Sequence, residues 1–200
     1  MTQTIPAQEQ RLYTVEEYLD LEDGAEFRSE YDNGQINEMT GGTLDHNQIS
    51  GNCYIALSLS LKGQDYRVFM ADVKLWIPKF NKATYPDVMV VAGQPEYYLN
   101  RKTTITNPQI IIEVLSDSTR AYDWNQKVKM YRSISTLQEY ILIDQYKPEI
   151  DQFHRVGQKQ WSIYSYDEQD TELALKSIDL KISIADIYDK VQFETDLVTE

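Results

Sequence analysis

The sequence predicts an α/β (α+β) fold, in which helices flank a mixed central β-sheet, with an N-terminal hairpin and a C-terminal β extension. Three observations predict it: two segments with apolar residues at helical spacing, several short runs of β-forming residues, and turn signals between the runs. The length of 200 residues suits a single domain, expected at residues 12–200. Residues 1–11 are expected to form a flexible tail.

The amino-terminal part contains one helix signal and one hairpin signal. Residues 14–17 read Thr-Val-Glu-Glu, the pattern of a capping box, which predicts a short helix that runs through Leu21. Asp32-Asn33-Gly34 predicts the turn of a hairpin over residues 27–39, because Asn-Gly accepts the positive φ angles that a tight turn needs.

A second helix is expected between Asp45, as its cap, and Lys62-Gly63, where the chain should turn. Its apolar stripe consists of Ile49, Cys53, Ala56, Leu57 and Leu61. Cys53 is the single cysteine, so no internal disulfide is possible. Since Cys53 lies in this stripe, a small core residue is the favoured interpretation, and a nucleophile or a redox thiol is the alternative.

Most of the remaining chain is expected to form β-strands. Strands are predicted at residues 67–70, 73–77, 85–91, 109–115 and 139–143, with a hairpin at residues 149–153 and 160–166. The three consecutive isoleucines at residues 110–112 are typical of a strand that is buried on both faces. A helix is expected near residues 122–133, and a final short helix or docking segment at residues 182–191.

The charge balance limits the kinds of partner. The chain has 19 Lys and Arg residues against 32 Asp and Glu, so its formal net charge is −13. Phosphate contacts need basic surface, which argues against a protein that coats nucleic acid along its length. A few local basic groups, together with metal ions that carboxylates hold, can still neutralise the phosphates at a cleavage site. We find no signal peptide and no apolar run of roughly 18 residues, so we expect a cytoplasmic location without membrane contact.

Two acidic residues interrupt runs of β-forming residues that should be buried. Asp87 lies within residues 85–91, and Glu113 directly follows the three isoleucines. An unpaired buried carboxylate costs several kcal/mol, so each acid should have a compensating partner. If neighbouring strands bring the two within about 4 Å, they repel by roughly 4 kcal/mol at an effective dielectric constant near 20. A divalent cation that prefers hard oxygen ligands, Mg²⁺ or Mn²⁺, removes this conflict.

A lysine on the helix near residues 122–133 is a candidate to join the two acids. One side of this helix carries Trp124, Lys127, Val128 and Tyr131. If that side packs on the sheet, Lys127 reaches the boundary of the packed face, while Lys129 faces water. Lys127 is therefore the candidate catalytic cation. The alternatives are a lysine that only covers apolar surface, and acids that face solvent or pair with a neighbouring Lys or Arg.

Several short motifs occur in the order typical of one bacterial family. They are Tyr-Thr-Val-Glu-Glu-Tyr at residues 13–18, Glu-Tyr-Asp-Asn-Gly at 30–34, His46, Tyr-Pro-Asp-Val at 85–88, Ile-Glu-Val-Leu-Ser at 112–116, Ser-Thr at 118–119, Asp123 with Lys127 and Tyr131, Glu-Tyr at 139–140 and Ile-Asp at 143–144. On these motifs the chain resembles the Uma-type family of restriction endonucleases over roughly residues 12–190. The central Pro-Asp, Glu-Val-Leu-Ser and Asp-x-x-x-Lys-x-x-x-Tyr series is the specific part.

The resemblance implies a restriction-endonuclease-like core and a nuclease of the PD-(D/E)XK type. The signature of that superfamily continues Glu-x-Lys, but Leu115 stands where its lysine belongs. The family supplies the lysine from the following helix, which implies Lys127. The resemblance also implies that Glu30 is an N-terminal acid near the metal, and it leaves His46 at a matching position without a settled role.

The implied activity is that of a Mg-dependent phosphodiesterase, an endonuclease. Asp87, Glu113 and the backbone carbonyl of Val114 are expected to hold Mg²⁺, with Mn²⁺ as a substitute, and Lys127 and Glu30 complete the catalytic set. The expected partners are nucleic acid, with DNA favoured, and a second copy of the chain in a homodimer. Two alternatives stay open: a catalytically inactive nucleic-acid-binding or regulatory module on the same fold, and a self-assembling protein with tyrosine-rich faces.

Overall fold

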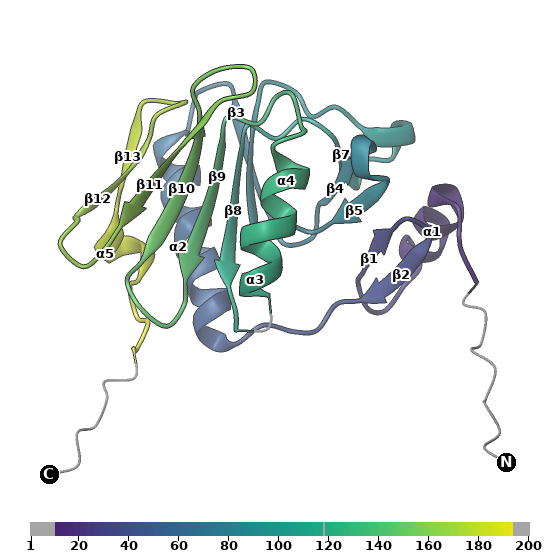
Figure 1. The fold of residues 1–200 in the computed structure, drawn as a ribbon, viewed down its shortest axis with the longest axis horizontal. Coiled ribbons are helices and arrows are strands. Elements are labelled where there is room, and N and C mark those ends of the chain that lie inside the picture. Colours follow the sequence, from purple (N-terminus) through teal and green to yellow (C-terminus); the bar gives the residue numbers. More distant parts are fainter. Residues whose placement is uncertain (1–10, 118, 194–200) are drawn as a thin grey trace, which may run out of the picture.

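A computed structural model of the protein describes residues 11–117 and 119–193 (Figure 1). The helical elements are α1 Val15–Glu22, α2 Leu44–Ser60, the 3₁₀ turns η1 Pro78–Phe80 and η2 Tyr98–Asn100, α3 Arg120–Tyr122, the π-helical turn η3 Asp123–Lys127, α4 Val128–Tyr131 and α5 Ile184–Ile187. The strands are β1 Ser29–Asp32, β2 Gln35–Glu38, β3 Tyr66–Met70, β4 Lys74–Ile77, β5 Lys82–Thr84, β6 Val88–Ala92, β7 Thr104–Ile105, β8 Ile110–Leu115, β9 Glu139–Asp144, β10 Ile150–Arg155, β11 Trp161–Tyr166, β12 Glu172–Leu175 and β13 Leu180–Ser183. The tail predicted at residues 1–11 lies outside the described residues, except for Arg11.

A six-stranded mixed sheet forms the centre of the fold, with the strand order β11-β10-β9-β8-β6-β3. The pair β8–β9 is parallel, and the other neighbouring pairs are antiparallel. Helix α2 covers one face of this sheet, and the helical segment from α3 to α4 covers the other (Figure 1). The predicted mixed sheet between helices is therefore confirmed.

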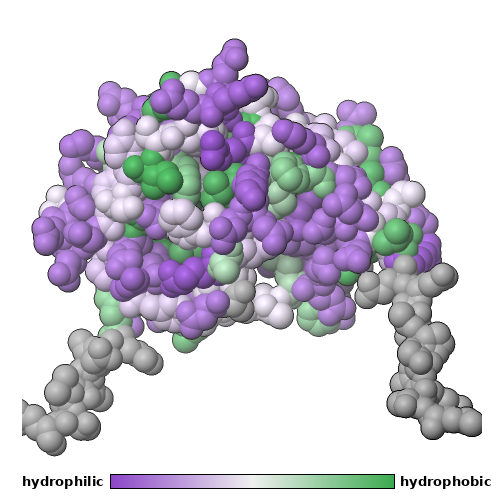
Figure 2. Space-filling model, viewed as in Figure 1, coloured by the Kyte–Doolittle hydropathy of each residue, from purple (hydrophilic) through white to green (hydrophobic). Residues whose placement is uncertain are grey.

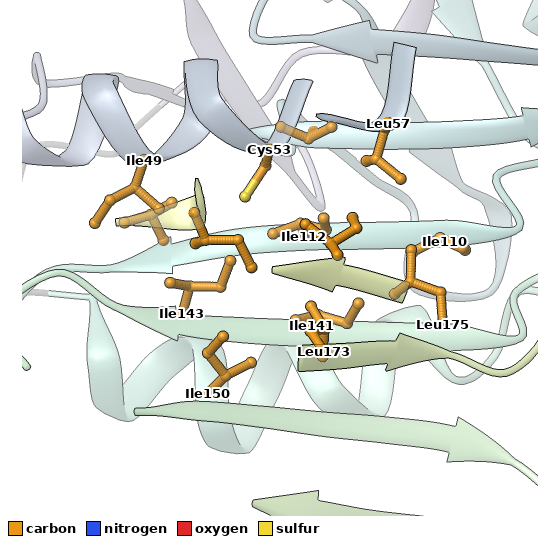
Figure 3. Close-up of a cluster of buried hydrophobic side chains, with 14 of the residues drawn as sticks. Ile49, Cys53, Leu57, Ile110, Ile112, Ile141, Ile143, Ile150, Leu173 and Leu175 are labelled. Atoms are coloured by element: carbon orange, nitrogen blue, oxygen red, sulfur yellow. The ribbon is translucent and has the colours of Figure 1, made fainter. Parts of the chain in front are cut away.

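Strand β8 lies at the centre of both hydrophobic cores. Ile110, Ile112 and Val114 join the core under α2, together with Cys53 and the carboxy-terminal hairpin β12–β13 (Figure 3). Ile111 and Leu115 join the opposite core, under α4. All residues of β8 are buried, which is the physical reason for its continuous apolar run.

Cys53 is a core residue, as predicted. Its side chain is 1% exposed and packs between α2 and the central sheet. Burial raises the pKa of the Cys53 thiol to about 12. The thiol is therefore neutral and inaccessible in the folded protein, which argues against a catalytic cysteine.

The amino-terminal hairpin is part of a second sheet, with the order β2-β1-β5-β4-β7. Its turn is as predicted, since Asn33 and Gly34 have φ angles of 49° and 97°. Tyr18 of α1 stacks on Tyr31 of β1 at 5.2 Å between ring centroids, and this pair packs on Trp76 of β4. The strand predicted at residues 73–77 is present as β4, and it belongs to this second sheet, where it pairs with β5 and β7.

The start of α2 differs from the prediction. Thr43, not Asp45, is the N-cap, because its hydroxyl accepts a hydrogen bond of 3.1 Å from the backbone amide of His46. Asp45 lies in the first turn, where its negative charge still favours the helix dipole. Both residue types are good caps, so the sequence alone does not separate two positions that lie so close together.

Three further boundaries were also predicted incorrectly. Asp87 precedes β6 rather than lying inside the strand. The helix predicted near residues 122–133 begins at Arg120 and contains the π-helical turn η3. Residues 182–191 begin with the end of β13 and continue into the single turn of α5. The strands of the β12–β13 hairpin have only four residues each, which is too short for a clear alternating pattern.

The face of the molecule seen in Figure 2 is predominantly hydrophilic, with separate hydrophobic areas. Within the described residues, no helix combines the length and the apolar composition needed to cross a bilayer. This finding agrees with the absence of a long apolar run in the sequence.

The central position of β8 predicts a large difference between two isoleucine substitutions. Ile112→Ala should lower the free energy of unfolding by about 2–5 kcal/mol, because it leaves a cavity beside α2. Ile163→Ala, on the half-exposed face of β11, should cost less than about 1 kcal/mol. Urea denaturation of both variants measures the difference, and equal losses would contradict the two-sided burial of β8.

Candidate functional site

The register of β6 and β8 brings the two candidate acids to the same end of neighbouring strands. Val88 pairs with Ile112 in this antiparallel ladder, so the next position along places Asp87 opposite Glu113. Just beyond the last pair of the ladder, Oδ2 of Asp87 accepts a hydrogen bond of 2.8 Å from the backbone amide of Val114 on β8. Asp87, Glu113 and Val114 line one cavity.

Glu113 is buried and is held by two donors. It is 4% exposed, and its Oε1 lies 3.0 Å from Nζ of Lys127 and 2.7 Å from the hydroxyl of Tyr131. Burial raises the pKa of Glu113, and the charges of Asp87 and Asp123 act in the same direction. The Lys127 ammonium opposes this rise. A cation that approaches the free side of Glu113 would further favour the carboxylate form.

Lys127 is buried between two carboxylates, rather than at the boundary of the packed face as predicted. It is 8% exposed, and its Nζ lies 3.0 Å from Glu113 Oε1 and 3.0 Å from Asp123 Oδ1. Burial alone would lower the pKa of Lys127, but the two carboxylates outweigh burial and raise it well above its ordinary value. The ammonium therefore stays charged at neutral pH.

The π-helical turn η3 brings Asp123 and Lys127 to the site. These residues are the first and last of the turn, and both are buried. Trp124 and Tyr131 were expected to anchor one packed side of this helix, but Trp124 is 36% exposed and contacts Phe153 by its edge. The segment therefore packs through Asp123 and Lys127 of the widened turn and through Tyr131 of α4. Single π-helical turns occur frequently at functional sites.

Asp87 is oriented by a histidine from the first turn of α2. Nε2 of His46 lies 3.2 Å from Oδ2 of Asp87, the same oxygen that the Val114 amide binds. Burial lowers the pKa of His46, but the hydrogen bond and the negative charge of Asp87 outweigh burial, so the pKa is raised. Gly42 passes close to the imidazole, where an added Cβ would make a contact tighter than ordinary van der Waals distance.

Glu30 reaches the cavity from the second sheet. It lies on β1, lines the same cavity as Asp87 and Glu113, and its negative charge raises the pKa of Lys127 and of Lys82. Lys82 is itself paired with Asp32 at 3.0 Å and bonded to the hydroxyl of Tyr122. The cavity is therefore built between the two sheets.

The cavity is strongly acidic. Its volume is about 510 Å³. Six carboxylates are among its lining residues: Glu30, Glu38, Asp87, Glu113, Asp117 and Asp123. Within the described part of the chain, Lys127 is the single lysine of the lining, and no arginine joins it. Also within that part, no three His, Cys, Asp or Glu side chains already form a ready-made metal centre.

The structure brings all of the sequence-predicted site residues to this cavity. Asp87, Glu113, Val114, Lys127 and Glu30 line it together, and so does His46. Two contacts in the site were not predicted from the sequence: the ion pair of Asp123 with Lys127 and the hydrogen bond that Tyr131 donates to Glu113. The i, i+4 spacing of Asp123 and Lys127 was a signal for the first, because such pairs meet on a helix.

Comparisons with known proteins identify the family of the chain. Residues 15–185 match the model of the Uma2 family, which is described as "Putative restriction endonuclease". Two uncharacterized proteins of Synechocystis sp., sll1609 and slr1290, are each 36% identical to this chain. The alignment with sll1609 covers 88% of this chain and 96% of that protein, and the alignment with slr1290 covers 89% and 92%.

A solved structure gives an independent comparison of the fold. The crystal structure of a "putative nuclease" from Anabaena variabilis matches this structure with a TM-score of 0.71 at 22% sequence identity. The match covers 88% of this chain and 97% of that chain. At this level of identity the likeness establishes the fold, and the predicted nuclease-like core is confirmed.

The contact between Gly42 and His46 predicts that two neighbouring glycines respond differently to substitution. A Cβ at Gly42 would lie 3.0 Å from Nδ1 of His46, whereas a Cβ at Gly41 would meet nothing within 4 Å. Gly42→Ala should therefore shift the imidazole by a few tenths of an ångström and lower the stability, and Gly41→Ala should do neither. Imidazole ¹⁵N chemical shifts and thermal unfolding measure the two effects, and identical behaviour of the two variants would refute the close approach.

The contact between His46 and Asp87 predicts a shift in titration. The Asp87 carboxylate favours the charged imidazolium form of His46, whereas burial disfavours it. Asp87→Asn removes the favourable charge, so it should lower the pKa of His46. Imidazole resonances followed by NMR between pH 5 and 9 measure the change. His154 lies on β10, and its signal should be unaffected by the substitution. An unchanged pKa of His46 would mean that Asp87 does not bind the imidazole in solution.

Proposed function

The chain belongs to the Uma2 family of restriction-endonuclease-like proteins, and on this premise we propose that it is a metal-dependent endonuclease that hydrolyses phosphodiester bonds of DNA. The observation that carries the proposal is the acid excess of the cavity, where six carboxylates face one lysine. A phosphodiester is itself an anion and would be repelled from such a site. A divalent cation changes the sign of the local field and lets the phosphate enter.

The donor set of the cavity fits Mg²⁺, with Mn²⁺ as a substitute. Asp87, Glu113 and the carbonyl of Val114 would hold the ion, and all three are hard oxygen ligands. A strand residue directs its amide and its carbonyl toward the same neighbouring strand, so the Val114 carbonyl faces the side where its amide already binds Asp87. Mg²⁺ commonly keeps several waters and takes one or two carboxylates, so a ready-made centre of three acidic side chains is not required.

When bound, the ion supplies an activated water and neutralises charge on the phosphate. In the hydrolysis, a water gives up a proton as its oxygen forms a bond to phosphorus, the bond from phosphorus to the leaving sugar oxygen breaks, and the leaving oxygen takes up a proton. Lys127 is fixed by Glu113 and Asp123 beside this centre, so its ammonium stabilises the negative charge that grows on the phosphate oxygens.

The other residues hold the ligands in place. Tyr131 donates a hydrogen bond to Glu113 and leaves the second oxygen of that carboxylate for the cavity. The Val114 amide and His46 both bind Oδ2 of Asp87, which leaves Oδ1 of Asp87 for a ligand. Glu30, from the opposite wall, would assist by directly binding the ion or one of its waters.

A catalytically inactive nucleic-acid-binding or regulatory module is the second candidate function. It is favoured by the net charge of −13 and by the pairing of Lys127, the single lysine in the described lining of the cavity, with two carboxylates. Both candidates keep the fold and differ in metal binding. A Mg²⁺ or Mn²⁺ binding isotherm that is lost in Asp87→Ala supports the enzyme, and the absence of any isotherm supports the module.

The proposal predicts that cleavage depends on Lys127 and on a divalent ion. Wild-type protein should cut plasmid, single-stranded DNA or RNA in Mg²⁺ or Mn²⁺, and EDTA should stop the reaction. Asp87→Asn, Glu113→Gln and Lys127→Met should each lower the rate by about 10²–10³-fold or more. Gel assays of the fragments, with circular dichroism to verify folding, measure this.

Lys129→Met is the matched control for the lysine substitution. Lys129 lies on the same helical segment but is exposed to solvent, so its loss should leave the rate unchanged. Equal losses in the two lysine variants, or full activity of folded Asp87→Asn protein, would exclude this cavity as the active site.

A further inference from the structure

A second cavity adjoins the acidic one. Its volume is about 370 Å³, within the range of small-ligand sites, and it lies between the loop before β1, the start of α2 and the end of β3. The two cavities share their dividing wall, which consists of residues 39–42, His46 and Asp87. A group bound in the second cavity would therefore lie next to the proposed catalytic carboxylate Asp87.

The lining of the second cavity differs in character from that of the acidic cavity. Phe27 presents an aromatic ring that is 69% exposed, and Met39 and Met70 add polarizable thioether side chains. Asn47 adds a side-chain amide, while its backbone amide bonds to the carbonyl of Thr43. An exposed ring, adaptable methionines and one side-chain amide suit a flat group with apolar faces and a polar edge.

The charges of this lining disfavour a phosphate as the occupant. Glu26 and Asp87 are acidic, and the one arginine, Arg28, is already engaged within the described structure. Its guanidinium lies 3.0 Å from Asp72 Oδ1 and donates a hydrogen bond of 2.9 Å to the carbonyl of Ala71. An uncharged group with hydrogen-bonding edges is therefore preferred over an anion.

We propose that the second cavity binds an unstacked nucleobase of the nucleic-acid substrate while the adjoining phosphate lies in the acidic cavity. The substrate class then becomes single-stranded or locally opened nucleic acid, because a base inside a duplex cannot reach a pocket. This inference rests on the proposed function for its choice of ligand. It also accounts for the low basic content of the chain, since stacking on Phe27 replaces part of the affinity that phosphate contacts supply in duplex-binding proteins.

Uncharged nucleosides test the second cavity without any cleavage or metal. Adenosine and cytidine would be titrated into metal-free protein with ¹³C-labelled methionine methyl groups. The Met39 and Met70 signals should shift and saturate, because both residues line the cavity. The signals of Met89 and Met130, which are buried in the core under α4, should stay unchanged. Ribose 5-phosphate, which has no base, should produce no shift.

Substitutions of Phe27 identify the ring as the stacking surface. Phe27→Ala should weaken nucleoside affinity about tenfold, and Phe27→Trp should retain it, because base stacking depends on an aromatic face. Tyr97→Ala removes another exposed ring that lines neither cavity and should have no effect. Because Phe27 is exposed, its substitutions should leave the protein folded, and thermal unfolding of each variant verifies this.

The outcomes separate this inference from the proposed function. Saturable shifts at Met39 and Met70 that Phe27→Ala weakens support the base pocket even if no nucleic acid is cut. Three outcomes overturn the base pocket, whatever the nuclease assay gives. The shifts are absent, they appear equally at Met89 and Met130, or Phe27→Ala leaves them unchanged. If cleavage is observed, single-stranded DNA should be cut faster than duplex, and Phe27→Ala should reduce this preference. Faster cleavage of duplex by the wild type, or a preference for single strands that Phe27→Ala leaves unchanged, also overturns the pocket.

Discussion

The site depends on one hydrogen bond at the end of the β6–β8 ladder, where the Val114 amide binds the carboxylate of Asp87. An amide beyond the last pair of a ladder needs a partner, and Asp87 supplies it. The same bond fixes the position of the acid relative to Glu113 on the adjacent strand. The architecture of the central sheet, buried on both faces of β8, therefore sets the spacing of the two acids.

Around this bond the protein holds an excess of negative charge close to one buried ammonium. Lys127, Glu113 and Asp123 form a compact group, but Asp87 and Glu30 add two more acids to the same cavity. Repulsion among these carboxylates costs stability in the absence of a cation, and an electrostatic cost of this kind is typical of functional sites. The second sheet contributes by carrying Glu30 to the wall that the central sheet cannot provide.

The sequence predicted the parts of the site that leave a local signal. Asp87 and Glu113 interrupt apolar runs, and the helical spacing selected Lys127 over Lys129. The π-helical turn was not predictable, since its hydrogen bonds depend on how the segment fits against the sheet. The hairpin β1–β2 and strand β4 were predicted, but their assembly into a second sheet was not. Strands β5 and β7 have only three and two residues, too few to show alternation, and the partner of a strand is decided by packing rather than by its own pattern.

The buried thiol of Cys53 can serve as a probe of local opening of the protein. A thiol reagent reacts with the thiolate, and this group is both shielded by α2 and held in its neutral form. Modification of Cys53 therefore requires that α2 separate from the central sheet. The rate of thiol labelling at a given pH measures how often this local opening occurs. His46 is carried by the first turn of α2, and the same fluctuation withdraws the imidazole from Asp87.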